Sequence, residues 1–196
     1  MPMLYEPADI MIHIQGKGIV VKEKSVVAYQ KSDNKIVAFG TEAYDMAGKN
    51  IEGIEVISPL RQGMVIDYVA AWKLFSYLLQ KAMGKKRPFL RRPAVAVCMP
   101  KGITPVEKKV LEDVLMIAGA KELFFSEISI EEFLGEFSEK YPKEFQKFKI
   151  TVAIAKDEPE RYLKESIREL LEYAAQEKIP QQRVYELFEG LKEKKA

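Results

Sequence analysis

The feature that most constrains the fold is the alternation of short apolar runs with amphipathic stretches between residues 94 and 155. Strands are predicted at Ala94–Met99, Glu122–Ser126 and Ile150–Ala155, because short apolar runs bounded by polar residues are typical of buried strands. A capping-box spacing with proline in the first turn predicts a helix over 104–118, and a second helical stretch follows over 129–137. Strands and helices in alternation indicate an α/β fold.

The N-terminal part is predicted to be a meander of short strands. Strands at Ile10–Ile14 and Ile19–Val21 flank Gly16-Lys17-Gly18. A hairpin is expected to follow, with strands at Ser25–Gln30 and Lys35–Phe39 joined by the turn residues Ser32-Asp33-Asn34.

A long amphipathic helix is predicted from about Tyr68 to Ala82. Asp67 is placed to cap its first turn, and apolar residues recur along one face at spacings of three and four. Trp72 and Phe75 lie on that face and are expected in the core. Further helices are expected within 157–191.

Composition limits the classes of function. Hydrophobic residues make up 47% of the 196 residues, enough for a core, and a net charge of +2 gives no reason to expect nucleic-acid binding. Cys98, the single cysteine, is expected to fill core space. His13 has no second histidine to form a metal site. The chain lacks a signal-peptide pattern and an apolar run of the roughly 18 residues that cross a bilayer, which favours the cytoplasm.

Several motifs, in order along the chain, resemble the bacterial actin family of rod-shape proteins, the MreB family. Residues 16–49, beginning GKGIVVKEKSVVAY, are similar to the family's GKGIVLNEPSVVAID and to the turn, strand and G-x-EA-x-x-M-x-G after it. Pro59–Tyr68 is similar to PLKDGVIADF, Pro100–Glu107 to VPSGVTEVE, and Ala118–Ala120 to the family's Ala-Gly-Ala. The resemblance covers about Ile10–Gly135.

This resemblance implies an α/β fold made of one actin-type (ribonuclease H-like) half, with a small inserted β-rich subdomain and extra C-terminal helices. We expect a single actin-like domain over 1–196, with the small subdomain within about 16–66. Residues 150–196 are expected to supply a closing strand and C-terminal helices, since Ile150–Pro159 is similar to the family's closing IPVYVADDP. The family's second half, of similar size, is not expected here.

The ATP motifs of the family are altered in this chain. The family opens with the glycine turn DLGTANT, whereas Leu4–Ile10 contains Glu6, whose charge repels phosphate, and Pro7, which lacks an N–H. Ile128 stands where the family's IEEP has the glutamate that orients water, with Glu127 beside it. The second phosphate turn, DIGGGTT, is not found. We therefore expect no ATPase activity, no catalytic residue, no bound cofactor and no metal.

The leading hypothesis is a non-catalytic MreB-like cytoskeletal or cell-shape scaffold or regulator. The alternatives are a divergent actin-fold ATPase completed by a partner chain, and a stand-alone protein-interaction adaptor. Expected partners are an anionic membrane surface and full-length MreB-type filaments or other cell-shape proteins, with a homodimer as an alternative and no nucleic acid. By its family position Asp67 is a candidate functional carboxylate, although helix capping explains it equally well.

The segment 84–93 is the predicted membrane-binding site. In the family, the loop at this position carries an apolar pair that enters the bilayer in some members, and Phe89-Leu90 stands there. The basic residues around the pair are Lys85, Lys86, Arg87, Arg91 and Arg92. Their charge would attract anionic lipid, so a peripheral location at the inner face of the cell membrane is expected. The alternative is a solvated basic turn with Phe89 folded back on the domain.

Overall fold

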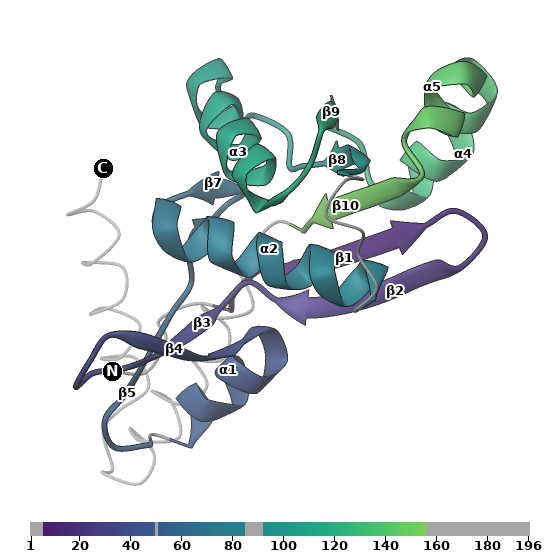
Figure 1. Cartoon of the computed structure of the whole chain (residues 1–196). Helices are drawn as coiled ribbons and strands as arrows, with labels where there is room; N and C mark the ends of the chain where they lie inside the picture. The colour runs from purple at the N-terminus through teal and green to yellow at the C-terminus, as the bar shows by residue number, and fades with distance from the viewer. Residues whose placement is uncertain (1–5, 50, 85–91, 156–196) are drawn as a thin grey trace, which may run out of the picture. The chain divides into compact units, whose positions relative to one another are not determined.

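A computed structural model describes residues 6–49, 51–84 and 92–155 (Figure 1). The chain divides into two compact units, one of Met1–Met3 with Pro7–Asp157 and the other of Leu4–Glu6 with Glu158–Ala196. All helices and strands given below belong to the first unit. The helices predicted within 157–191 lie outside the described residues.

The first unit is built on a five-stranded sheet with the strand order β2-β1-β10-β8-β9. The strands are β1 (Asp9–Ile14), β2 (Gly18–Lys24), β8 (Ala94–Cys98), β9 (Glu122–Ser126) and β10 (Ile150–Ile154). β1 is antiparallel to both β2 and β10, whereas β10, β8 and β9 are parallel. The predicted strands are confirmed, and the one latest in sequence lies at the centre of the sheet (Figure 1).

Helices α2 (Tyr68–Met83) and α3 (Pro105–Ala118) share one core with one face of this sheet. The predicted cap of α2 is confirmed, because Asp67 Oδ1 accepts a hydrogen bond from the Ala70 N–H at 2.9 Å. The capping box that starts α3 is confirmed as well. Phe75 is fully buried in this core, and Trp72 packs against it partly buried. Its largest buried residues include Ile10, Ile12, Leu74, Phe75, Leu78, Leu79, Leu111 and Leu115.

The other face of the sheet is covered by α4 (Ile130–Lys140) and the short α5 (Pro142–Lys147), which leads into Phe148. Successive strand residues point to opposite faces, so β8 supplies Val95 and Val97 to the first core but Ala96 and Cys98 to the second. Phe133 of α4 is buried there, with its ring centroid 6.2 Å from that of Phe124. Cys98 therefore fills core space, as predicted.

A small subdomain is formed by β3 (Val27–Gln30), β4 (Lys35–Phe39) and β5 (Ile54–Ile57), with α1 (Gly40–Gly48) packed on one face of their antiparallel sheet. The apolar cluster between helix and sheet contains Val26, Ala28, Ala38 and Ala43. The hairpin over 25–39 was predicted, whereas α1 and β5 were not. A two-stranded pair, β6 (Leu60–Arg61) with β7 (Met64–Val65), leads from this subdomain into α2.

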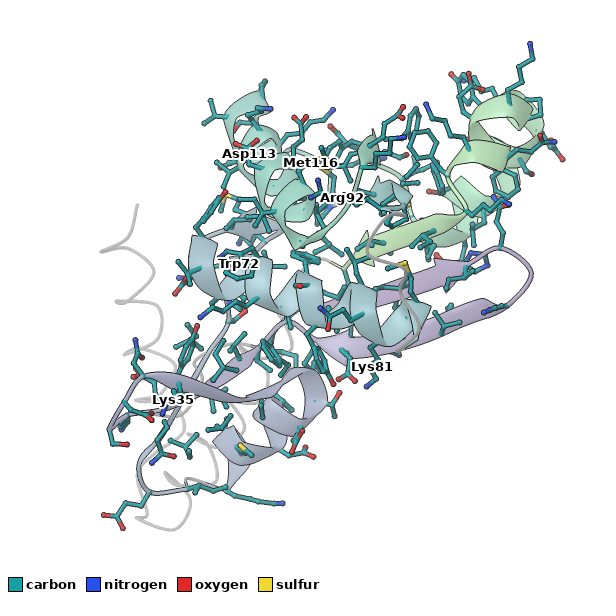
Figure 2. The ribbon with its side chains drawn as sticks, in the orientation of Figure 1. Lys35, Trp72, Lys81, Arg92, Asp113 and Met116 are labelled. Carbon is teal, nitrogen blue, oxygen red and sulfur yellow. The ribbon has the colours of Figure 1, made fainter. Side chains whose placement is uncertain are left out.

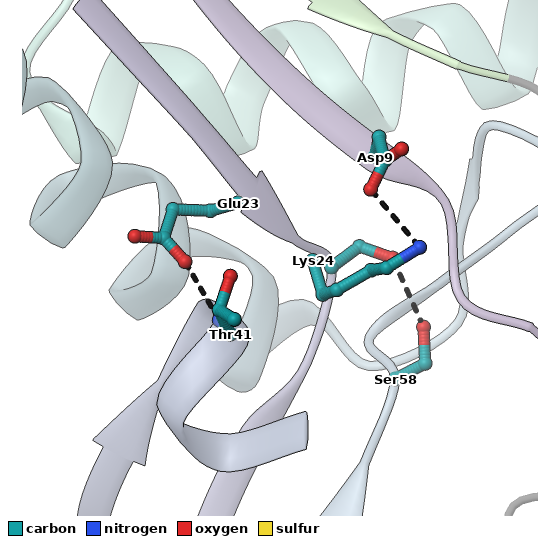
Figure 3. Close-up of polar contacts among 6 residues, drawn as sticks. Asp9, Glu23, Lys24, Thr41 and Ser58 are labelled. Carbon is teal, nitrogen blue, oxygen red and sulfur yellow. Dashed lines mark hydrogen bonds and ion pairs between the residues drawn. The ribbon is translucent and has the colours of Figure 1, made fainter. Parts of the chain in front are cut away.

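Glu23, 8% exposed on β2, joins the small subdomain to the main sheet. Its carboxylate accepts a hydrogen bond from the Thr41 N–H of α1 at 2.6 Å (Figure 3). It also accepts one from Lys81 Nζ of α2 at 2.5 Å. Gly40 permits this contact, because a Cβ there would lie 2.4 Å from the carboxylate. Lys24 Nζ lies 3.0 Å from Asp9 Oδ1 (Figure 3). The hydroxyl oxygens of Ser25 and Ser58 lie 3.3 Å apart.

Candidate functional site

A pocket of about 290 Å³ lies beyond the carboxyl ends of β10, β8 and β9. This is the place where open α/β sheets bind their ligands. Its lining includes the buried Cys98 and Ile154, while Lys101, Glu127 and Glu131 are exposed residues of the same lining. The pocket thus combines an apolar interior with charged residues, two of them acidic and one basic.

Several backbone N–H groups beside this pocket already form hydrogen bonds within the chain. The Ser129 hydroxyl accepts from the Glu132 N–H at 3.2 Å, and the Glu132 carboxylate accepts from the Ser129 N–H at 3.1 Å. This reciprocal capping box satisfies donors at the start of α4. On the neighbouring strand end, the Met99 N–H donates to the Ser126 carbonyl at 2.9 Å, and Pro100 has no N–H.

The thiol in the pocket is not suited to nucleophilic chemistry. Burial, with a smaller contribution from the charge of Glu131, raises the pKa of Cys98 to about 12. The thiolate is the nucleophilic form of cysteine, so Cys98 is protonated and unreactive near neutral pH.

The structure brings together residues that sequence reasoning had considered separately. Glu127 and Ile128, singled out by the altered ATP motif, line the same pocket as Cys98. Lys101 and Glu131 were missed as lining residues. Both lie shortly after the end of a parallel strand, β8 for Lys101 and β9 for Glu131, and that position was the available signal.

The remaining candidate residues lie elsewhere. Asp67 caps α2, and its charge adds to burial in raising the pKa of Tyr29. His13 is partly buried, and burial lowers its pKa. Within the described ranges, no group of three His, Cys, Asp or Glu residues could hold a metal ion, and no helix is long and apolar enough to cross a membrane.

Of the predicted membrane-binding residues, only Arg92 is described. Arg92 is exposed, and its guanidinium donates to the Met116 carbonyl near the end of α3 at 2.5 Å (Figure 2). The other six lie outside the described residues, namely Lys85, Lys86, Arg87, Phe89, Leu90 and Arg91.

Comparison with known proteins agrees with this fold. The family model described as MreB/Mbl protein matches residues 6–136. The cell shape-determining protein Mbl of Bacillus cereus is 35% identical over 120 residues, and MreB of Escherichia coli K12 is 32% identical over 125 residues. Each alignment covers 61% of this chain and 35% of the relative, so the chain spans about a third of the length of these curated relatives.

A solved structure shows the same relationship. MreB5 of Spiroplasma citri, in a crystal structure with ADP, is 28% identical with a TM-score of 0.56, over 66% of this chain and 38% of that one. The family match covers more than half of the chain and includes both the small subdomain and the strands that end at the pocket. The chain therefore belongs to the MreB/Mbl family and has the actin-type α/β fold of that family.

Proposed function

We propose that this chain is a non-catalytic MreB-type module that works with the cell-shape machinery in the cytoplasm, at the inner face of the cell membrane. The curated relatives are named as cell shape-determining proteins, which supports the cell-shape part of the proposal. The non-catalytic part rests on one observation. The pocket at the carboxyl ends of the central strands offers carboxylates where a nucleotide would need donors for phosphate.

The described residues of that pocket fit a nucleoside triphosphate poorly. Glu127 and Glu131 would repel its negative charge, and Lys101 is the one cation in the lining. The start of a helix binds phosphate through free backbone N–H groups. At α4, the N–H groups of Ser129 and Glu132 already donate to each other's side chains. Ile128 cannot orient a water molecule for attack.

Isothermal titration with Mg-ATP tests this directly. We expect no heat beyond that of dilution, with full-length Escherichia coli MreB as the positive control. Micromolar affinity of the pure chain would contradict the proposal and favour a divergent ATPase. Affinity that arises only when a partner chain is added would favour an ATPase completed by that partner.

The membrane part of the proposal rests on the sequence of residues 84–93. Each basic residue near an anionic leaflet contributes about 1 kcal/mol, and burying the side chains of Phe89 and Leu90 would add about 1.5–3 kcal/mol apiece. Together these contributions could hold the protein reversibly at the surface. The apolar pair is what favours lipid over other polyanions, because charge alone does not distinguish between them.

Co-sedimentation with anionic liposomes at physiological salt separates insertion from simple charge attraction. Phe89→Ser combined with Leu90→Ser should lose most binding if the pair enters the bilayer. Neutralising Lys85, Lys86 and Arg87 should weaken binding as well. Arg92 is best kept in these variants, because its bond to the Met116 carbonyl gives it a structural role. If the serine variant binds as well as the original chain, the insertion proposal fails.

We further propose that the protein partner is a filament of a full-length MreB-type relative. Co-pelleting with polymerised Escherichia coli MreB tests this, with the chain alone as the control. Recovery in the pellet only when filaments are present supports the proposal. Recovery of the chain alone in the pellet would indicate self-assembly instead, and recovery in neither case would favour a stand-alone adaptor.

A further inference from the structure

A second cavity, of about 330 Å³, lies beside the outer edge of the small subdomain's sheet. Met46 and Ala47 of α1 line one side, and Ile54 and Val56 of β5 line the other. Ile51, in the connection between them, is 42% exposed. We call this cavity the β5 groove. Lys31, Glu52 and Glu55 add charged groups to this lining. The groove thus places a helix and a strand edge beside the same cavity, which is the arrangement in which extended peptides are added to sheets.

The ladder between β3 and β5 determines which backbone groups face the groove. Lys31 N–H donates to the Gly53 carbonyl at 2.8 Å, so Gly53 and, by alternation, Glu55 and Ile57 direct their backbone groups toward β3. Ile54 and Val56 direct theirs away from β3. The Ile54 N–H is engaged by the Ile51 carbonyl at 3.2 Å, which leaves the Ile54 carbonyl and both backbone groups of Val56.

The outer edge of β5 is not paired with another strand in the part of the chain that the structure describes. An unpaired edge of this kind is a template for one more strand. The available groups are two carbonyls and one N–H, enough for three hydrogen bonds to an added segment. Although β5 is only four residues long, an added strand would also contact the apolar side chains that line the groove.

Side-chain alternation specifies the chemistry of the added segment. The side chains of Ile54 and Val56 pack with the cluster between α1 and the sheet, so every second residue of an added strand would face the groove and should be apolar. The residues between would lie on the same face as Glu55. Glu55 and Glu52 are both exposed, and neither forms an ion pair with a described residue. The groove lining holds these two carboxylates and one cation, Lys31, so its net negative charge favours lysine or arginine in the added segment.

We propose that the β5 groove binds an extended segment of another protein, with the pattern apolar-basic-apolar, as an added strand beside β5. The backbone of Val56 supplies its central hydrogen bonds. Met46, Ala47 and Ile51 hold its apolar side chains, and Glu55 selects the basic one. The proposed interaction requires neither a bound nucleotide nor a membrane surface.

The test uses the full 196-residue chain labelled with ¹⁵N and three synthetic peptides. The first is Ser-Val-Lys-Val-Ser, and the matched controls are Ser-Val-Glu-Val-Ser and Ser-Ser-Lys-Ser-Ser. In NMR titrations the first peptide should shift the amide signals of Ile51, Ile54 and Val56. Both controls should bind several-fold more weakly, because one reverses the charge and the other removes the apolar side chains.

Two substitutions separate specific addition from general stickiness. Val56→Pro removes the outward N–H but no bond of the β3 ladder, and should weaken the first peptide about fivefold. Glu55→Lys should reverse the preference, so that the glutamate peptide binds about two- to fivefold better than the lysine peptide at low salt. Circular dichroism checks that both variants fold, and Ile51→Ser replaces Val56→Pro if that variant does not.

Three outcomes would overturn the proposal. The first is equal binding of the three peptides, and the second is binding that leaves the amides of Ile54 and Val56 unshifted. The third is a concentration-dependent shift of those same amides without any peptide, which would make a second copy of this chain the occupant of the groove.

Discussion

The pocket beyond the carboxyl ends of β10, β8 and β9, here called the central pocket, has a volume of about 290 Å³. The β5 groove is similar, at about 330 Å³, and each has a helix beside it. They differ in their backbone groups. At the central pocket, Ser129 and Glu132 satisfy each other's N–H groups, whereas at the groove both backbone groups of Val56 face outward. Recognition depends on polar groups that still need partners, not on volume. We therefore expect the β5 groove, and not the pocket at the strand ends, to be the site that binds a ligand.

The largest loss of stability is expected in the core behind the central pocket, where Phe133 clusters with the lining residues Cys98, Ile130 and Ala153. Phe133 is 1% exposed and packs against Phe124 between α4 and the sheet. Phe133→Ala should lower the free energy of unfolding by about 3–5 kcal/mol, because it leaves a cavity in this core. Urea denaturation measures the change. A loss below about 1 kcal/mol would mean that this core is loosely packed.

A smaller loss of stability is expected when Glu23 is changed, because Glu23 joins the small subdomain, and therefore the β5 groove, to the main sheet. Burial alone would raise the pKa of Glu23, but the hydrogen bonds from Lys81 and Thr41 outweigh it and lower the pKa. Glu23→Gln should cost about 1–3 kcal/mol near neutral pH, because it removes the charge and turns one accepting oxygen into an NH2 group that faces the donor of Thr41 or Lys81.

The pH dependence of this contribution has a definite sign. A lowered carboxyl pKa means that the stabilisation is complete above the ordinary value of 4.5 and is lost as the pH falls through the folded-state pKa. Denaturation curves at several pH values should show the gap between the original chain and Glu23→Gln narrowing below about pH 4.5. A gap that stays constant would mean that the Glu23 carboxylate charge does not contribute.

Much of the main sheet could be predicted from sequence, because its signals are local. The run Ala94–Met99 and the capping box at Thr104 each lie within a few residues, and both were found where expected. The central place of β10 could not be predicted, because strand order is set by pairing between distant segments. Helix α1 was missed because no residue marks its start. Its N-cap position is Phe39, which makes no side-chain capping bond.

The two candidate sites also differ in how far the sequence indicated them. The altered ATP motif pointed to Ile128 and Glu127, which do line the central pocket. The β5 groove gave no sequence signal, because it depends on which edge of β5 pairs with β3. Ile54 and Val56 alternate with Gly53 and Glu55 in either register, and only the ladder shows which of them face outward.

Breaking the capping box of α4 beside the central pocket should lower the free energy of unfolding by about 1 kcal/mol. Ser129→Ala removes the hydroxyl that accepts from the Glu132 N–H, at a typical cost for a helix cap. Thr104→Ala breaks the equivalent box on α3 and is the matched control, since Thr104 does not line the pocket. Both should lose similar stability by urea denaturation. Mg-ATP binding by the Ser129 variant alone would show that the cap was what excluded phosphate.

The smallest effect on stability is expected at the β5 groove. Ile51 is 42% exposed, and Val37, on β4 of the same sheet, is 43% exposed. Ile51→Ser and Val37→Ser should each change the free energy of unfolding by no more than about 0.5 kcal/mol, because exposed side chains contribute little to the core. Only Ile51→Ser should weaken the Ser-Val-Lys-Val-Ser peptide, because Val37 does not line the groove. Equal loss of peptide binding in both variants would mean that the small sheet attracts peptides through general hydrophobicity. Loss confined to Ile51→Ser would identify a surface side chain that matters for recognition and not for folding.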